Sequence, residues 1–494
     1  MEEEHKDISY KNITKATAIF GGTQVMSIAA NIVKGKLAAC IVGAYGLGIS
    51  AHLYSTASPI QQLFTCGLNV SAIKALSSAH SEDERSECIT CLRRLITLLA
   101  SMALLCTVAS AWWLSQLTFG SQSHWAWFCS VAIAVFFLIL ASGETTILQG
   151  FRELKALATC NLITPVSGLF IAIPLYWLWG IEGIAPSIAA MGIAAWAAAK
   201  FFTGRLHLKH SKQTWRETLR QGKSTLIMGA SIMGSNMAGA LAGYIINTGI
   251  GQMGTETDIG FYQAMTNITL QCTSMVFAAM AADYFPHLAS ITRQKAQATE
   301  LVCKEGEIAL LIIAPITLTL ITAAPAAIRI LLTAEFDTAL FLLRAMSLCL
   351  ISRAICFPLD YICIAHGDNR FFLLVEGGWS NIKTILFVLC GYAIARLDGI
   401  AIALCICAFL DVFISIAINR WRYGIRYSAD YCKMAGGLTA AALACFLAGL
   451  WTDTVISYSL MSVLTLSTWV YSYKQIDRRI DIKCIIKNKL HGKR

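Results

Sequence analysis

The chain has 494 residues, of which 56% are hydrophobic and only 14% are charged. A soluble globular protein carries about 25% charged residues, so this composition excludes that class and indicates a chain embedded in a membrane over most of its length. The formal net charge of +10 would suit a nucleic-acid partner, but the positions of the bases, given below, make that partner unnecessary.

Hydropathy predicts an all-α polytopic membrane protein with fourteen spans and no cleavable signal peptide, since the first apolar run is long enough to cross a bilayer. The predicted spans lie near residues 13–34, 45–73, 92–114, 125–147, 157–178, 182–202, 224–246, 258–284, 305–324, 339–365, 371–395, 399–419, 432–451 and 454–473.

The distribution of Lys and Arg fixes the expected orientation. If the N-terminus lies inside, the inner segments hold 32 of the 39 bases, while the outer loops hold Lys34, Lys36, Arg329 and Arg396. This bias is the positive-inside pattern and predicts that both termini are cytoplasmic. The bases of segments 205–223 and 474–494 would then face anionic lipids, so we expect no nucleic acid among the partners.

Other motifs point to no cofactor. The eighteen cysteines lie almost entirely in apolar runs, and Cys88 and Cys91 lack the second pair that a zinc site needs. The stretch from Gly222 to Thr225 resembles the end of a phosphate-binding loop, but Glu217 stands where that loop requires glycine. We therefore expect no metal and no ATP site, and only H⁺ or Na⁺ coupling is considered below.

An internal repeat relates the two halves of the chain, with a roughly constant offset between matching segments. It sets Gln149-Gly150 beside His366-Gly367, and the turn at 179–184 beside the turn at 396–400. Each copy holds six predicted helices, an even number, so both copies have the same orientation in the membrane. The sequence thus predicts a six-helix lobe (1–204), a basic cytoplasmic linker (205–223), a second six-helix lobe (224–420), an additional helix pair (421–473) and a basic cytoplasmic tail (474–494).

Charged residues within the second lobe indicate a polar cavity. Arg353 and Asp360 share one predicted span, Glu376 and Lys383 share the next, and the members of each pair are two helical turns apart on one helical face. The two bases would lie roughly 20 Å from the connecting turn, where a charge is costly unless it faces protein or water. One interpretation is that these bases bind an anionic substrate. The other is that they form structural ion pairs with Asp360 and Glu376 across the two helices.

Two further bases and three further acids are candidates. Lys34 and Arg344 lie near the expected outer ends of their spans and are weaker candidates for substrate binding. The remaining intramembrane acids are candidates for ion coupling or for the cavity wall, and Asp411 is the first of them because it has no base beside it in sequence. Together with the two acids of the hairpin, the candidate acids are Asp411, Asp360, Glu376, Glu144 and Asp283.

Several stretches in order along the chain resemble one family. These stretches are Lys15-Ala16-Thr17 with Phe20-Gly21-Gly22 and Gln24-Val25, then Gly260-Phe261-Tyr262-Gln263-Ala264, Asp283-Tyr284-Phe285-Pro286-His287-Leu288, and Ile364-Ala365-His366-Gly367-Asp368. The chain resembles the O-antigen (Wzx-type) and lipid III flippase-like polysaccharide biosynthesis proteins of the multidrug/oligosaccharidyl-lipid/polysaccharide (MOP) superfamily. It departs from many members by having fourteen predicted helices rather than twelve, a number found in the lipid II flippases of the same superfamily.

The resemblance implies a MATE-like two-lobed transporter in the bacterial inner membrane. It implies transfer of an undecaprenyl-pyrophosphate-linked oligosaccharide from the cytoplasmic to the periplasmic leaflet by alternating access, with polysaccharide polymerase machinery as a further partner. Arg353 and Lys383 would hold the pyrophosphate, since Arg makes forked contacts and Lys supplies a point charge.

Three alternatives remain at this stage. A lipid II flippase would share the fold and the anionic head group. A cation-coupled drug or metabolite antiporter would share the fold but should favour cations in its cavity. A membrane glycosyltransferase, polymerase or ligase needs a catalytic site on a large external loop, and the longest predicted outer loops have only about a dozen residues. We therefore expect a transporter and not an enzyme.

Overall fold

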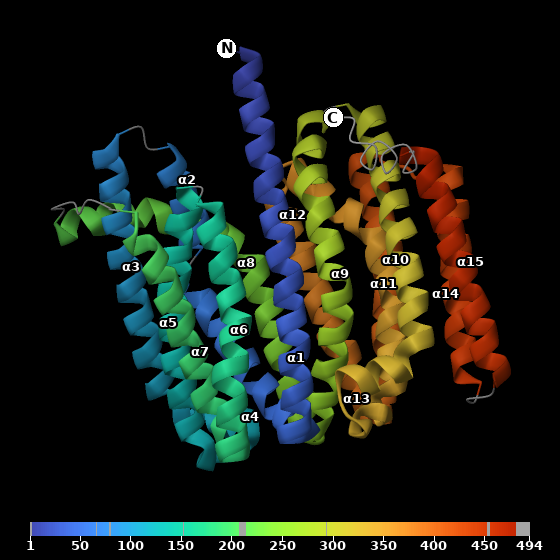
Figure 1. Ribbon diagram of the computed structural model, residues 1–494, viewed down its shortest axis with the longest axis horizontal. Coiled ribbons are helices and arrows are strands. Elements are labelled where there is room, and N and C mark those ends of the chain that lie inside the picture. The colour runs from blue at the N-terminus through green and yellow to red at the C-terminus, as the bar shows by residue number, and fades with distance from the viewer. Residues whose placement is uncertain are drawn as a thin grey trace. The chain divides into compact units, whose positions relative to one another are not determined.

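The computed structural model describes residues 2–65, 67–78, 81–151, 153–206, 214–292, 294–451 and 455–480, and every regular element within these ranges is helical (Figure 1). The elements up to residue 204 are α1 (Glu2–Thr65), α2 (Leu68–Ser78), α3 (Glu82–Ala109), α4 (Ala111–Phe119), η1 (Gln122–His124), α5 (Trp125–Gly150), α6 (Leu154–Trp179), η2 (Gly180–Gly183) and α7 (Ile184–Gly204).

The elements from residue 215 on include two short π-helices, η4 and η5, and the first of these elements, α8, begins inside the predicted linker. They are α8 (Trp215–Met253), α9 (Glu256–Ile291), α10 (Lys295–Leu331), η3 (Ala334–Ala339), α11 (Leu340–Ala365), α12 (Asn369–Phe372), η4 (Leu373–Ser380), α13 (Asn381–Ile418), η5 (Asn419–Tyr423), α14 (Ala429–Leu450) and α15 (Val455–Ile480).

The predicted class, an all-α polytopic membrane protein, is confirmed. Within the described residues, eight helical stretches are long and apolar enough to cross a membrane. Three of them, 22–65, 154–204 and 370–423, contain a turn or a non-helical break at Gly43, at η2 and at Ala395–Arg396. Helices α8, α9 and α15 are not among the eight stretches, so the count of fourteen spans and the location of the termini stay predictions.

The predicted repeat is visible in the backbone of two tight helical turns. Gly180 has φ 56° and ψ −129°, and Arg396, in the matching turn of the second repeat, has φ 53° and ψ −132°. A β-carbon on Gly183 would lie 2.3 Å from the Leu175 carbonyl oxygen, and one on Gly399 would lie 1.8 Å from the Gly391 carbonyl oxygen. Both turns therefore bring residues more than two helical turns apart in sequence into backbone contact, which no continuous helix allows.

The second half of α1 and the start of α9 pack against each other through two glycines, Gly48 and Gly260, that occupy equivalent positions in the two repeats. A β-carbon on Gly48 would lie 1.8 Å from the Glu256 carbonyl oxygen, and one on Gly260 would lie 1.9 Å from the Ala44 carbonyl oxygen. Ala44 and Glu256 are equivalent at the same sequence offset, so the two repeats exchange equivalent contacts, as the subunits of a two-fold dimer do. We call this packing the reciprocal glycine contact.

Contacts divide the chain into two compact units, one of residues 1–261 with 331–333 and the other of 262–330 with 334–494. In the first unit α5 packs against α3 and α7, and α1 packs against α6 and α8. Helix α8, which the sequence assigns to the second lobe, thus packs within the first unit. The predicted lobe boundaries stay a prediction.

The core of the second unit gathers buried side chains of α9, α10, α11 and α14. Helix α11 packs along α13, and α14 lies beside α15, the pair drawn in red in Figure 1. This packing holds α11, which carries Arg353 and Asp360, in place between the core and α13.

Candidate functional site

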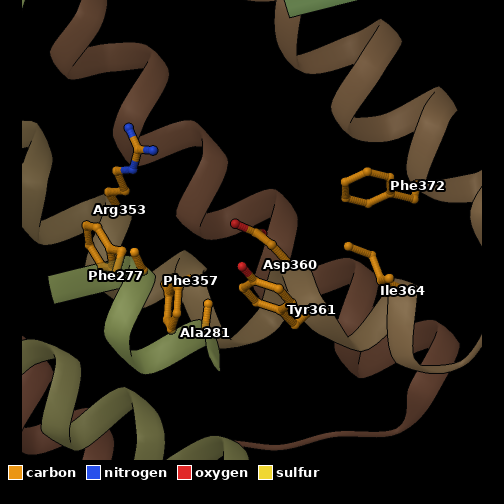
Figure 2. A pocket seen from close by; sticks show the side chains of 9 residues that line it. Phe277, Ala281, Arg353, Phe357, Asp360, Tyr361, Ile364 and Phe372 are labelled. Atoms are coloured by element: carbon orange, nitrogen blue, oxygen red, sulfur yellow. The ribbon is translucent and has the colours of Figure 1, made fainter. Parts of the chain in front are cut away.

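A polar cavity opens in the second unit among α9, α11, η4 and α13. Two adjoining pockets of about 370 and 450 Å³ share Arg353 and Asp360 in their walls. Arg353 and Asp360 are two helical turns apart, so their side chains lie on the same side of α11, as Figure 2 shows. The prediction that Arg353 and Asp360 line one cavity agrees with this geometry.

Aromatic rings from α9 and α11 form one wall of the smaller pocket (Figure 2). The Phe277 and Phe357 ring centroids are 5.0 Å apart, and the Phe357 and Tyr361 centroids are 5.3 Å apart. The Tyr284 hydroxyl donates to the Pro358 carbonyl oxygen at 2.7 Å, which ties α9 to α11 behind the rings. The wall is mostly apolar, so the charged side chains are the groups that select a ligand.

Arg353 is exposed to this cavity, and its guanidinium carbon lies 5.7 Å from the Phe277 ring centroid. No carboxylate among the described side chains forms an ion pair with Arg353. The guanidinium therefore keeps its forked set of donors for a ligand. The alternative pairing with Glu376 concerns a side chain outside the described part of the structure, as does any role for the Asp283 side chain.

Lys383 lies behind the cavity wall and not in it. Its side chain is 4% exposed, and its ammonium forms an ion pair with Asp411 and lies 3.4 Å from the Cys407 carbonyl oxygen. Asp411 is 34% exposed and lines the larger pocket. Lys383 thus reaches a ligand only through Asp411. The ion pair with Asp360 or Glu376, which the sequence left open as the alternative to substrate binding, is not the one described for Lys383, whose carboxylate partner is Asp411.

The tight turn in α13 explains this pair. Residues 391 and 399 touch across the turn, so the two halves of α13 run antiparallel, and residue 383 lies opposite residue 407. Residue 411 is one helical turn beyond 407 on the same face. Counting residues outward on both sides of the predicted turn at 396–400 would therefore have predicted the Lys383–Asp411 pair. Asp411 has no base near it in sequence, but it has one in the folded chain.

Hydroxyl groups and one indole line the larger pocket, and sequence reasoning missed them. The Thr266, Thr269 and Thr384 hydroxyls donate to carbonyl oxygens of their own helices, which leaves their oxygens as acceptors. The Ser352 hydroxyl is buried and has no hydrogen-bond partner among the described residues. Trp379, in the π-helix η4, is 56% exposed and lines the same pocket. Acceptors beside an aromatic face suit a sugar, whose hydroxyls donate and whose C–H face is apolar.

Arg344 lies away from this cavity. Its side chain is buried, and Nη1 donates to the Gly449 carbonyl oxygen at 2.5 Å. Gly449 is next to the last residue of α14, where unpaired carbonyl groups and the helix dipole attract a cation. The structure thus gives Arg344 a role in fixing the end of α14 to α11 and does not place it where a cavity ligand would bind.

Lys34 lies in the first unit, on α1 against α6 and α7. A β-carbon on Gly168 would lie 2.8 Å from Lys34 Cδ and 3.1 Å from Met191 Cε, so Gly168 provides the space for this side chain. No described carboxylate forms an ion pair with Lys34. It remains a candidate for substrate binding.

Glu144 is the centre of a buried polar cluster in the first unit. Arg93 forms a forked pair with its carboxylate at 3.0 and 2.7 Å, Lys200 lies at 3.0 Å, and the Thr203 hydroxyl donates at 2.6 Å. These groups join α3, α5 and α7. A carboxylate with this many donors is a structural centre, because breaking such a network leaves charges buried without partners.

The remaining motifs contribute no ligand set. Within the described ranges, no three or more His, Cys, Asp or Glu residues are placed to hold a metal ion, and all cysteines there are free thiols. Residues 207–213 of the linker and residues 481–494 of the tail lie outside the described residues, and the predicted lipid contacts of both segments stay predictions.

The chain matches a family described as polysaccharide biosynthesis protein over residues 13–292. It is 21% identical over 375 residues to the lipid III flippase of Escherichia coli (strain K12), a match that covers 74% of this chain and 88% of the relative. The lipid III flippase of Shigella flexneri matches with the same identity and coverage.

Solved structures show the fold. The lipid II flippase MurJ in an inward closed conformation superposes with a TM-score of 0.71 at 13% identity, covering 94% of this chain and 99% of the other. An inward-facing MATE family transporter of the MOP superfamily superposes with a TM-score of 0.67 at 14% identity, covering 82% and 98%. These matches confirm the predicted MATE/MOP-like fold. The family match covers more than half of the residues of this chain, so the chain belongs to the polysaccharide biosynthesis protein family.

Proposed function

We propose that the protein is a flippase that moves an undecaprenyl-pyrophosphate-linked oligosaccharide, such as an O-antigen unit, from the cytoplasmic to the periplasmic leaflet by alternating access. The family supports a role in polysaccharide biosynthesis, and the flippase relatives support the kind of substrate. The protein then lies in the bacterial inner membrane with fourteen spans and both termini in the cytoplasm.

The observation that carries this proposal is Arg353. An exposed guanidinium in a membrane cavity, with no ion-pair partner among the described side chains, is costly unless the cavity is hydrated or an anion binds there. A pyrophosphate offers the forked acceptors that a guanidinium prefers. The hydroxyl groups of α9 and α13 and the Trp379 indole would meet the attached sugars, and the polyprenyl tail would stay in the lipid.

Asp411 is the candidate for ion coupling in this proposal. It lines the cavity and holds Lys383, so a phosphate that enters would compete with Asp411 for the Lys383 ammonium. Protonation of Asp411 would release Lys383 for the ligand. If H⁺ or Na⁺ drives transport, collapsing the gradient across proteoliposomes lowers the flipping rate, and an unchanged rate excludes ion coupling.

A flipping assay in proteoliposomes tests the function. We expect R353A to lower the rate roughly tenfold or more, since a charge-assisted contact contributes about 1.5–3 kcal/mol. R353K should be intermediate, because an ammonium keeps the charge but loses the fork. R329A is the control: Arg329 is exposed and forms an ion pair with Asp337 at 3.3 Å in a predicted outer loop. Wild-type flipping by correctly inserted R353A would refute the cavity assignment.

A lipid II-type substrate is the second candidate, favoured by one observation. The match to the lipid II flippase structure extends over 94% of this chain, whereas the match to the MATE transporter covers 82%. Both substrates carry a pyrophosphate, so Arg353 does not discriminate between them. The flipping rates of lipid II and of an undecaprenyl-pyrophosphate oligosaccharide, measured in the same vesicles, distinguish the two substrates. A faster rate for lipid II would replace the O-antigen-type oligosaccharide as the proposed substrate.

A further inference from the structure

A further pocket of the second unit shares no lining residue with the cavity around Arg353. It has a volume of about 710 Å³ and is formed by the start of α10, the segment before α14 and the end of α15. Its charged lining residues are Glu300, Lys304, Glu307, Arg426 and Arg479. Three bases and two acids leave one positive charge in excess. We call this the inner basic pocket.

The inner basic pocket lies at the level where three predicted spans end. On α10 its lining residues fall between 296 and 308, across the predicted start of the span 305–324. The lining residues of the next segment precede the predicted span 432–451, and Arg479 follows the predicted span 454–473. The expected topology places these three ends on the cytoplasmic side. With this topology, a ligand in the pocket would be level with the head groups of the inner leaflet.

Arg426 is presented to the pocket by a fixed segment. Its neighbour Ile425 is buried, and the Tyr427 hydroxyl on its other side donates to the Ile355 carbonyl oxygen at 3.1 Å. The Tyr427 ring also stacks on Tyr431, with centroids 4.2 Å apart. Arg426 itself is exposed, and no carboxylate among the described side chains forms an ion pair with it. Its guanidinium therefore keeps its donors for a ligand.

The other two bases of the pocket have carboxylate partners. Arg479 Nε and Nη2 lie 2.9 and 2.8 Å from Glu307 Oε2, and Nη1 donates to a side-chain oxygen of α15 itself at 2.7 Å, so this guanidinium is engaged on all sides. Lys304 lies 2.7 Å from Glu300, but both side chains are exposed. An exposed ion pair contributes little, so Lys304 can leave Glu300 for a ligand. Arg426 and Lys304 are the two groups that a ligand can engage.

The helices that form the pocket are fixed to one another. A β-carbon on Gly306 of α10 would lie 2.8 Å from the Tyr431 ring of α14, so glycine lets these two helices approach closely. The Trp469 indole of α15 donates to the Thr319 hydroxyl of α10 at 3.0 Å. Helix α10 is thus held against both α14 and α15, and the pocket between them has defined walls.

We propose that the inner basic pocket binds the phosphodiester of a phospholipid that carries one net negative charge. Basic pockets between membrane helices on the cytoplasmic side suit such head groups. Arg426 supplies the forked donors that a phosphate prefers, and Lys304 supplies a second positive charge. The charge of the lipid balances the positive charge in excess in the pocket. The site is independent of what the protein transports.

The bound lipid has a structural consequence for the additional helix pair. Lys304 belongs to α10, whereas Arg426 belongs to the segment that leads into α14. A phosphate that contacts both joins the second repeat to α14 and α15, which lie outside the repeat. The lipid should therefore stabilise the folded protein in proportion to its concentration, because it binds the native state alone.

Native mass spectrometry of the full-length protein in detergent, titrated with phosphatidylglycerol, tests the site. Phosphatidylcholine, which has the same phosphodiester but no net charge, should bind more weakly. We expect R426A to weaken phosphatidylglycerol binding roughly tenfold or more, because a charge-assisted contact is lost. R426K should be intermediate, since it keeps the charge and loses the fork. R420A is the matched control, because Arg420 is an exposed base of η5 outside the pocket.

E300Q distinguishes an anionic lipid from one that carries an ammonium group. This variant removes the acid that holds Lys304, so phosphatidylglycerol should bind more tightly than it does to wild type. If the pocket instead held phosphatidylethanolamine, Glu300 would bind the ammonium, and E300Q would weaken lipid binding. Tighter binding of phosphatidylglycerol by E300Q supports the proposal, and weaker binding overturns it.

Thermal unfolding in detergent separates a lipid from a free anion. Phosphatidylglycerol should raise the unfolding temperature of wild type and of R420A more than that of R426A. Equal protection by inorganic phosphate would identify a soluble anion as the ligand and overturn the lipid assignment, as would equal lipid binding by R426A and wild type. Neither readout involves transport, so loss of this site leaves the proposed flippase function standing, and loss of flipping leaves the site standing.

Discussion

Lys383 and Asp411 are far apart in sequence and form an ion pair because the turn at Ala395–Arg396 folds the halves of α13 against each other. The ammonium is buried and the carboxylate faces the cavity. A ligand in the cavity therefore contacts the Asp411 carboxylate, whose charge is balanced by the Lys383 ammonium behind it. The cavity presents one open positive group, Arg353, among the described side chains and one neutralised pair.

The Lys383–Asp411 pair should stabilise the fold only as a pair. D411N leaves a buried ammonium with the Cys407 carbonyl as its remaining described partner, and we expect it to lower the free energy of unfolding by about 3 kcal/mol. The double variant K383M/D411L removes both charges and should recover most of this loss. Thermal unfolding in detergent measures both, and a double variant less stable than D411N would contradict the prediction.

The reciprocal glycine contact should respond equally to substitution on either side. G48A and G260A each place a β-carbon within 1.9 Å of a carbonyl oxygen, so α1 and α9 must separate, at a cost of about 1–3 kcal/mol. We expect both variants to lower the free energy of unfolding by similar amounts, as measured by thermal unfolding in detergent. G239A is the control, because nothing lies within 4 Å of its β-carbon position. A large effect of one glycine alone would argue against a symmetric contact.

Arg344 should matter for stability and little for transport. R344M leaves the Gly449 carbonyl oxygen without its donor, which costs about 1–3 kcal/mol and loosens the end of α14. Hydrogen exchange should rise in α14, while flipping per folded molecule should fall less than in R353A. If R344M instead abolishes flipping with α14 still protected, Arg344 binds the substrate, as its sequence position allowed.

Asp368, in the turn between α11 and α12, gives a pH-dependent stability. The Arg422 guanidinium at 3.2 Å and then the Tyr423 hydroxyl at 2.8 Å hold the pKa of this carboxyl below its ordinary value. A depressed pKa contributes stability above the unfolded-state value, near 3.9, which is lost as the pH falls through the folded-state value. Wild type should therefore be slightly more stable than D368N at pH 7, and the difference should vanish in acid.

A double-mutant cycle checks the cause of the Asp368 effect. R422Q removes the first of the two donors, so adding D368N to R422Q should cost less than D368N alone. Equal costs would mean that Arg422 does not set the charge of Asp368.

The sequence was sufficient for the features that depend on composition and spacing. Apolar runs predicted the helices, and an interval of two helical turns placed Arg353 and Asp360 on one face of α11. The constant offset between the repeats predicted matching turns, and Gly180 and Arg396 have matching backbone angles. Each of these features follows from one segment alone, or from comparing the sequences of two segments, so none requires knowledge of the tertiary packing.

The partners of the charged residues depend on packing that the sequence does not state. Lys383 pairs through a turn, Arg344 binds a carbonyl oxygen that every residue possesses, and His52 meets Glu256 from a distant part of the chain. A backbone acceptor has no sequence signal, and a buried histidine in an apolar run looks like any core residue. The equivalent positions of Gly48 and Gly260 in the two repeats do not by themselves predict that α1 and α9 meet there.

The agreement of Gly180 and Arg396 makes the first half of the chain a guide for engineering the second. At φ 53° and ψ −132°, Arg396 is the one non-glycine residue with positive φ in the described structure, and such a conformation costs of order 1–3 kcal/mol. The two turns share a backbone path, and the first repeat has glycine, the residue that adopts this conformation without strain. A designer who wants a more robust protein can copy residues from one half to the other, beginning with glycine at position 396.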